Sequence, residues 1–183
     1  MTEVVRLTLV SHAMTDAMAA GRFPTDEPLN DMGRRQAEAV AGLGIQSDAR
    51  QLAGPERRAR QTAELLGLHA TTEPRLADLD CGRWRGQTLG APSSEDLERW
   101  LTEPGRAPHG GESIADLIER VAGWLASLTD TIAPAVAVTH PAVIRAALLL
   151  ALDAAPKSFW RIDIAPLSRT GLHFRNGRWT LRL

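Results

Sequence analysis

A short apolar run that stops at a histidine most constrains what this chain can fold into. Residues 4–10 are mainly valine and leucine, and Ser11 and His12 follow them directly. An apolar run of this length, bounded by polar residues, is typical of a buried strand. In an open parallel sheet, ligands bind just beyond the carboxyl ends of the strands, so His12 stands where chemistry is expected.

The same arrangement recurs near the other end of the chain. Residues 135–139 (AVAVT) lead directly into His140, and Pro141 then opens an apolar segment. If the two predicted strands are neighbours in one sheet, His12 and His140 meet at its edge.

Helical signals fill most of the sequence between these strands. Asn30 is a good N-cap for a helix to about Leu43, before Gly44, and Pro55 suits the first position of a helix that continues over 57–66. Further helices are expected at 93–103, 113–128 and 142–152, with a short strand near 51–53 and irregular segments at 16–28 and 70–92. This alternation predicts an α/β fold, a three-layer sandwich whose mostly parallel central sheet carries helices on both faces.

The last residues, 170–183, predict a hairpin, because Asn176 and Gly177 form a two-residue turn signal between alternating apolar positions. The 183 residues fit one domain, 1–183. Cys81 is the only cysteine, which excludes a disulfide framework and suits a cytoplasmic protein. No apolar stretch is long enough to predict a membrane span, and a net charge of −1 does not indicate nucleic-acid binding.

Ionisable side chains gather at strand ends, helix starts and adjoining loops. Arg58 lies in the first turns of a helix, whose N-terminus favours an anion, and the loop at 76–86 offers carboxylates such as Asp78. Two histidines, an arginine and a carboxylate suffice for phosphoryl transfer through a histidine. One imidazole attacks phosphorus, cationic donors hold the equatorial oxygens, and an acid protonates the leaving oxygen.

Six stretches, in order along nearly the whole chain, resemble the motifs of the histidine phosphatase superfamily, whose fold is shared by cofactor-dependent phosphoglycerate mutases and many small phosphatases. They are residues 11–15 (SHAMT), 28–37 (PLNDMGRRQA), 54–63 (GPERRARQTA), 76–86 (LADLDCGRWRG), 110–113 (GGES) and 139–145 (THPAVIR). Any one match would be weak evidence, but six in order indicate a phosphoglycerate mutase-like fold.

The resemblance implies a role for each site residue and requires neither cofactor nor metal. His12 is the expected nucleophile and His140 its phosphate-binding partner. Arg58 is expected to clamp the phosphate. Asp78 stands where the family has its proton-donor glutamate, and its side chain is one methylene shorter. Thr15 completes the first motif and is expected near the substrate.

The departures from the family pattern remove polar phosphate contacts. Ser11 stands where the family has an arginine, and a hydroxyl cannot replace a charged bidentate grip. Ala13, Met18 and Gly54 stand where the family has a glycine, a polar residue and a serine. Another arginine entering the site would compensate, and the candidates are Arg22, Arg57, Arg83 and Arg85. Ser11, Thr15 and Arg22 are therefore the expected substrate-binding residues.

Several other residues are expected to have structural roles. Arg145 is expected to form an ion pair on its helix, Ser113 to cap a helix, and His109 to lie on the surface, with substrate contact as the alternative. Trp84 suits core packing and a pocket wall equally. The Ser11-His12 pair also suggests a serine hydrolase as an alternative, but the chain contains no Gly-x-Ser-x-Gly elbow.

The leading hypothesis is a phosphomonoesterase that hydrolyses a small phosphorylated substrate through a phosphohistidine on His12. A mutase is disfavoured, because its substrate must be held in two orientations by polar groups. The alternative is a catalytically weak or inactive homologue that binds a phosphorylated ligand or a protein partner. Residues 87–111, with the loop at 16–28, are expected to form a specificity cap. The sequence leaves open the identity of the substrate and whether the chain forms a homodimer.

Overall fold

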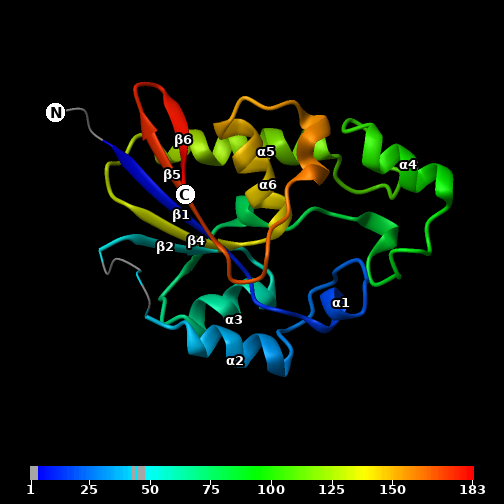
Figure 1. Ribbon diagram of the computed structural model, residues 1–183, viewed down its shortest axis with the longest axis horizontal. Helices are drawn as coiled ribbons and strands as arrows, with labels where there is room; N and C mark the ends of the chain where they lie inside the picture. Colours follow the sequence, from blue (N-terminus) through cyan, green and yellow to red (C-terminus); the bar gives the residue numbers. More distant parts are fainter. Residues whose placement is uncertain (1–3, 43, 45–47) are drawn as a thin grey trace.

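The computed structural model describes residues 4–42, 44 and 48–183 and contains a six-stranded sheet between helical layers (Figure 1). The strand order is β3-β2-β4-β1-β5-β6. The strands are β1 (Val5–Ser11), β2 (Arg50–Ala53), β3 (Thr71–Thr72), β4 (Ala135–Thr139), β5 (Arg169–Arg175) and β6 (Arg178–Arg182). The first four run parallel, and β5 and β6 add an antiparallel hairpin, which confirms the predicted α/β class.

Helices cover both faces of the sheet. One face carries α5 (Ile114–Leu128) and α6 (Pro141–Ala151), and the other carries α2 (Asp31–Ala39) and α3 (Arg57–Leu65) (Figure 1). Successive side chains of a strand point to opposite faces. In β1 and β4, therefore, one set of residues packs under α5 and α6 and the alternate set packs toward α3. Both faces are buried, which explains why β4 is apolar almost throughout.

The pairing of β1 with β4 brings the two histidines together. Ser11 lies opposite Thr139 in the parallel register, and the backbone N–H of His12 donates to the carbonyl oxygen of Thr139 at 2.9 Å. His12 and His140 therefore leave neighbouring strands at the same edge of the sheet, as the sequence predicts.

One predicted helix start and one predicted turn match the structure closely. Ser113 caps α5 in a reciprocal capping box with Asp116. In the β5–β6 hairpin, Asn176 and Gly177 adopt φ values of 53° and 77°, which is the left-handed geometry that a two-residue turn of this kind requires.

The predicted boundaries are wrong in two helices. Helix α2 ends at Ala39, earlier than expected, and the predicted end at Leu43 lies outside the described residues. Helix α3 begins at Arg57 rather than Pro55. Glu56 takes the N-cap position without capping the helix through its side chain, because its carboxylate is engaged elsewhere.

Both predicted irregular segments contain regular structure. A short helix, α1 (Asp16–Ala19), interrupts the loop at 16–28, because the Thr15 hydroxyl accepts from the backbone N–H of Met18 and caps it. The segment at 70–92 contains β3 and two 3-10 turns. The helix α4 (Ser94–Thr102) was expected, and a 3-10 helix at Pro156–Arg161 was not.

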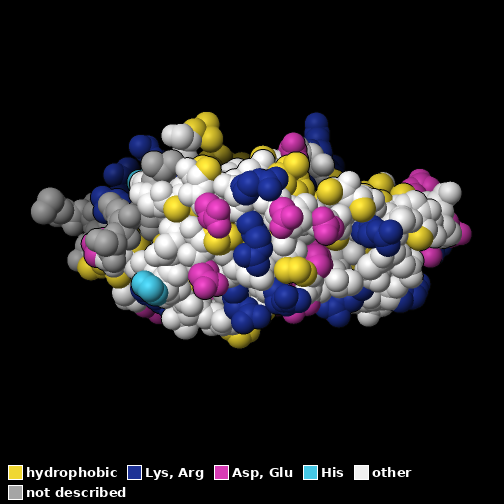
Figure 2. All heavy atoms as spheres, turned by 90° about the horizontal axis from the view of Figure 1, so that it is seen from below, with side chains coloured by type: hydrophobic (Ala, Val, Ile, Leu, Met, Phe, Trp, Pro, Cys, Tyr) yellow, Lys and Arg dark blue, Asp and Glu magenta, His cyan; other side chains and the backbone are white. Residues whose placement is uncertain are grey.

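The face that carries α2 and α3 has a mixed charge pattern. Figure 2 shows acidic and basic side chains intermixed there, so the residues described on that face form no continuous basic surface. Among the described residues, no helix has the length and apolar content needed to cross a bilayer.

Candidate active site

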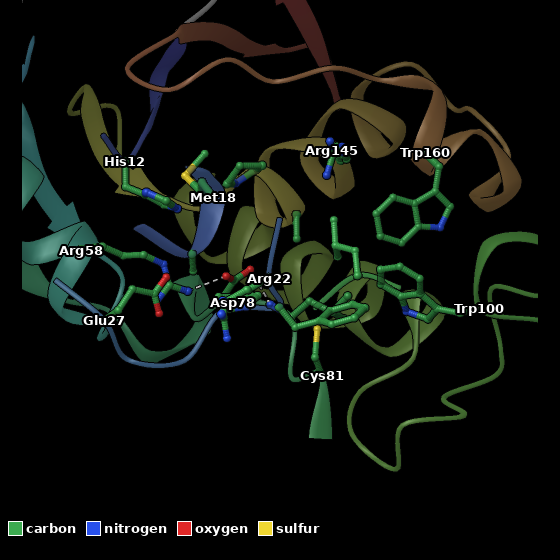
Figure 3. Close-up of a pocket in the computed structure, with 17 residues that line it drawn as sticks. His12, Met18, Arg22, Glu27, Arg58, Asp78, Cys81, Trp100, Arg145 and Trp160 are labelled. Atoms are coloured by element: carbon green, nitrogen blue, oxygen red, sulfur yellow. Dashed lines mark hydrogen bonds and ion pairs between the residues drawn. The ribbon is translucent and has the colours of Figure 1, made fainter. Parts of the chain in front are cut away.

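A cavity of about 200 Å³ opens at the carboxyl ends of β1 and β4, beside His12 (Figure 3). Its wall is formed by α1 and the loop after it, the first residues of α6, Trp100 of α4, and Trp160 of the 3-10 helix at Pro156–Arg161. His12, Arg58, Asp78 and Arg22, all predicted from the sequence, line this cavity.

His12 is buried, with 3% of its surface exposed, and its tautomer follows from one hydrogen bond. Its Nδ1 lies 2.7 Å from the carbonyl oxygen of Ala13. Because a carbonyl only accepts, Nδ1 carries the proton and Nε2 keeps its lone pair. Burial, helped by the nearby positive charges of His140 and Arg58, lowers the pKa of His12 to about 3. His12 is therefore a neutral imidazole with one free nitrogen.

His140 is fully buried next to His12, with their ring centroids 5.1 Å apart. Its Nε2 lies 2.7 Å from Oε2 of Glu56. Its Nδ1 lies 3.6 Å from Oδ2 of Asp78 and has no hydrogen-bond partner among the described residues. A buried ring nitrogen without a partner costs free energy, and an anion's oxygen would satisfy it when Nδ1 is protonated.

Glu56 is the member of this site that the sequence reasoning missed. One carboxylate oxygen meets His140, and the other accepts from the backbone N–H of Asp78 at 2.9 Å. Burial opposes ionisation, but these hydrogen bonds leave the pKa of Glu56 below its ordinary value. Gly54 provides the space, because a Cβ there would lie 3.0 Å from Nε2 of His140 and 3.3 Å from Oε2 of Glu56. Its place within the resembling stretch at 54–63 was the signal available in the sequence.

Arg58 is 1% exposed and is already engaged in the ligand-free site. Its Nη2 donates to Oδ2 of Asp78 and its Nη1 donates to the carbonyl oxygen of Thr25, each at 2.6 Å. Glu27 lies 3.7 Å away. Burial would raise the pKa of Asp78, but the charges of His140 and Arg58 outweigh it and lower that pKa to about 2. Asp78 is thus ionised and holds no proton to donate in this state.

Two predicted substrate-binding residues do not line the cavity. Ser11 is fully buried, and its hydroxyl has no hydrogen-bond partner among the described residues. Thr15 is buried and caps α1. Arg22 does line the cavity, at its exposed mouth, where Nη1 lies 3.4 Å from the carbonyl oxygen of Gly86.

The other candidate arginines lie outside the cavity lining. Arg83 donates to the carbonyl oxygen of Pro108, Arg85 lies 3.9 Å from Asp80, and Arg57 is exposed. Arg145 lines the cavity instead. None of the three named from the sequence therefore takes the position of a compensating cation.

The ion pair predicted for Arg145 is wrong. Among the described residues, no carboxylate lies within 4.0 Å of its guanidinium. Its Nε donates to the carbonyl oxygen of Ile162 at 2.7 Å, and the group lies over the rings of Phe159 and Trp160 at 5.7 and 5.6 Å. The unexpected 3-10 helix provides the two rings, and the residue directly after it provides the carbonyl.

The surface position predicted for His109 is also wrong. It is 1% exposed, and its ring packs against Trp84 and Trp100 at centroid distances of 5.1 and 6.4 Å. Trp84 is buried in this aromatic cluster rather than in the cavity wall. The cluster, which also contains Phe23, attaches α4 to the core.

Cys81 also lines the cavity, and its thiol is a second kind of group that can act as a nucleophile when ionised. Burial, together with the negative charges of Asp78 and Asp80, raises the pKa of its thiol to about 12. The thiol stays protonated, so it is a poor nucleophile in this site.

Comparison with known proteins agrees with this geometry. A curated bifunctional protein of Mycobacterium tuberculosis (strain H37Rv) is 32% identical over 181 residues, covering 89% of this chain and 49% of that protein. The chain thus spans about half the length of the mycobacterial relatives that it matches at this identity. The glucosyl-3-phosphoglycerate phosphatase of Mycolicibacterium vanbaalenii is 31% identical over 180 residues, with 87% of this chain and 79% of that protein covered.

A solved structure has the same fold. Mycobacterial glucosyl-3-phosphoglycerate phosphatase in complex with VO₃ superposes with a TM-score of 0.85 at 29% identity, covering 98% of each chain. The family profile of the histidine phosphatase superfamily (branch 1) matches residues 7–183. With that match over nearly its whole length, the chain belongs to branch 1 of the histidine phosphatase superfamily.

Proposed function

We propose that this protein is a phosphomonoesterase that hydrolyses a small phosphorylated substrate through a phosphohistidine on His12. The observation that carries the proposal is the buried, neutral imidazole of His12, with Nε2 free, in the wall of a cavity shared with Arg58. Burial keeps this nucleophile unprotonated throughout the range in which proteins normally work.

The reaction has two steps. In the first, Nε2 of His12 attacks phosphorus, the P–O bond of the ester breaks, and the alcohol leaves with a proton. In the second, water attacks the phosphohistidine, and inorganic phosphate leaves with restoration of the free imidazole. The Arg58 guanidinium and a protonated Nδ1 of His140 would hold the phosphoryl oxygens during both steps.

The leaving alcohol needs a proton that ionised Asp78 does not hold. A phosphomonoester monoanion brings one, since its second pKa is about 6. Once the phosphoryl group lies against Asp78, repulsion between the two negative groups raises the pKa of that carboxyl and favours transfer of the proton to it. Asp78 then passes the same proton to the leaving oxygen.

The names of the relatives support this reaction type. Two of the proteins compared above are phosphatases of a small organic phosphate, glucosyl-3-phosphoglycerate. From these relatives we infer for this chain only the class of reaction, phosphomonoester hydrolysis, and the class of substrate, a small phosphorylated molecule. We do not infer the individual compound.

One observation favours a second candidate, a weak or inactive homologue that binds a phosphorylated ligand. Ser11 supplies no guanidinium, and Arg58 is already paired with Asp78 at 2.6 Å. The family pattern leads us to expect two arginines at the phosphate, one at position 11 and one at position 58. Only Arg58 is present, so a phosphate must compete with Asp78 for its guanidinium.

The decisive experiment measures phosphate release from an aryl phosphate between pH 4 and 8. Wild type, His12→Ala and His69→Ala are compared, because His69 is an exposed histidine outside the cavity lining. We expect release by wild type and by His69→Ala, and labelled phosphate trapped on histidine in both. Ligand binding without release or phosphohistidine would reject the phosphatase in favour of the binding homologue.

A further inference from the structure

Apolar side chains form much of the cavity wall, among them Met18, Leu79, Leu89, Trp100 and Trp160. Figure 3 shows the two tryptophans on the side remote from His12, and their rings lie against each other at 4.3 Å between centroids. An apolar cavity of about 150 Å³ is known to hold benzene. The whole cavity here, including the phosphoryl end at His12, has about 200 Å³, so it suits a leaving group no larger than one planar ring.

The same wall offers few groups that could replace the hydration of a sugar. Hydroxyl groups that lose water without gaining hydrogen bonds cost free energy, so a polyol is a poor occupant of this part. Leu89 and Trp100 come from residues 87–111, which fits the expectation that this segment, with the loop at 16–28, forms a specificity cap.

One cation stands in this apolar wall. Figure 3 shows Arg145 beside Trp160, on the opposite side of the cavity from Glu27 and Arg58. Its guanidinium is half-buried, and burial lowers its pKa despite the more distant charges of Asp163 and Asp78. Only Nε is hydrogen-bonded within the described residues, and both Nη groups lack a partner there.

Two Nη groups without a partner on a planar guanidinium match the two oxygens of a carboxylate. The surrounding aromatic rings limit screening by water, which strengthens such a pair. Arg22 also lines the cavity, but it is exposed at the mouth, where a charge pair contributes little.

We propose that this site is selective for phosphomonoesters whose leaving group is a single planar ring carrying a carboxylate, which Arg145 binds at the end of the cavity remote from His12. This inference rests on the proposed function for the position of the phosphoryl group. It identifies Arg145 as a specificity-determining residue.

The test uses binding first, so that it does not depend on turnover. Affinities of the full-length protein are measured by calorimetry for phenylphosphonate and for its analogues with a carboxylate at ring position three, at position four, or on a methylene at position four. We expect at least one carboxylated analogue to bind about 10- to 100-fold more tightly, as a charged hydrogen-bonded pair would give. Equal affinity for all four ligands would overturn the proposal.

Variants then assign the gain to one arginine. Arg145→Met is expected to abolish the gain and Arg145→Lys to retain part of it, while Arg178→Met, an exposed arginine in the β5–β6 hairpin, is expected to retain all of it. A gain that survives Arg145→Met, or that is lost in Arg22→Met instead, would refute the assignment. Thermal melting verifies that each variant is folded.

Turnover separates this inference from the proposed function. The corresponding aryl phosphates are compared by kcat/KM, and the carboxylate is expected to raise it by a similar factor. Tight carboxylate-dependent binding without turnover would contradict the phosphatase but leave the role of Arg145 intact. Turnover without a carboxylate preference would support the phosphatase and contradict the role of Arg145.

Discussion

The protonation states of two buried side chains, His12 and Asp78, determine how the proposed reaction depends on pH. His12 remains neutral down to about pH 3, and Asp78 remains ionised down to about pH 2. Neither group titrates between pH 4 and 8, so the substrate's own proton controls the rate. We expect kcat/KM for an alkyl phosphate to be level at pH 4–5 and to fall about tenfold per pH unit above the substrate pKa of about 6.

The measurement is steady-state phosphate release across this range, with an aryl phosphate as the comparison. An aryl leaving group needs its proton less, so its profile should fall less steeply. A rate for the alkyl ester that rises toward pH 8 would exclude proton delivery through Asp78.

Glu56 is expected to act by positioning His140. Glu56→Gln keeps a hydrogen-bonding side chain of the same length but removes the charge that faces Nε2 of His140. We expect kcat to fall about 10- to 100-fold, in the range of charge-assisted hydrogen bonds at active sites. Glu64→Gln, an exposed position on the same helix, should leave kcat unchanged.

The split between kcat and KM separates positioning from a merely structural role for Glu56. A misplaced His140 should lower kcat and kcat/KM together, because its proposed contact with the phosphoryl oxygens matters in the transition state. A lower melting temperature with an unaltered kcat in Glu56→Gln would indicate only a structural contribution.

At the scale of helices, two glycines differ in the space around them, Gly33 in α2 and Gly123 in α5. A Cβ at Gly33 in α2 would lie 2.8 Å from the backbone nitrogen of Met14 and closer still to its carbonyl oxygen. Gly33→Ala should therefore lower the free energy of unfolding by about 1–3 kcal/mol. Gly123 in α5 has open space around it, so Gly123→Ala should raise that free energy by about 0.5–1 kcal/mol. Denaturant unfolding of both variants checks the opposite signs.

The sequence predicted those parts of the site that follow from strand ends. His12 and His140 could be paired because apolar runs mark β1 and β4, and parallel strands end at a common edge. Glu56 was not found, because the resemblance gives it no role within the stretch at 54–63 and its contact depends on the missing side chain at Gly54. Arg145 was assigned wrongly, because its environment comes from a 3-10 helix that has no strong periodic pattern.

At the scale of the whole molecule, the site joins segments from both ends and the middle of the chain, and its cationic groups are already paired with carboxylates. Glu27, Glu56 and Asp78 face Arg58 and His140, while His12 is neutral. Such internal pairing stabilises the empty site and weakens its attraction for an anion. An additional guanidinium should therefore shift this balance toward binding of phosphate.

Ser11→Arg is the variant that tests this balance. Ser11 is fully buried, and its backbone is hydrogen-bonded to residues 167 and 168, so a larger side chain must displace its neighbours. We expect kcat/KM to rise about 10²- to 10³-fold, since loss of one such donor costs that much. We also expect overpacking to cost about 1–3 kcal/mol, which lowers the melting temperature by roughly 2–12 °C for a chain of this length.

Ser11→Met provides the matched control, because it adds bulk without charge. It should lower the melting temperature comparably and leave kcat/KM no higher than in wild type. If Ser11→Arg is folded and shows no increase in activity, the missing guanidinium is not what limits the reaction. The pairing of Arg58 with Asp78 would then be the remaining cause, and the binding homologue would become the better description of this chain.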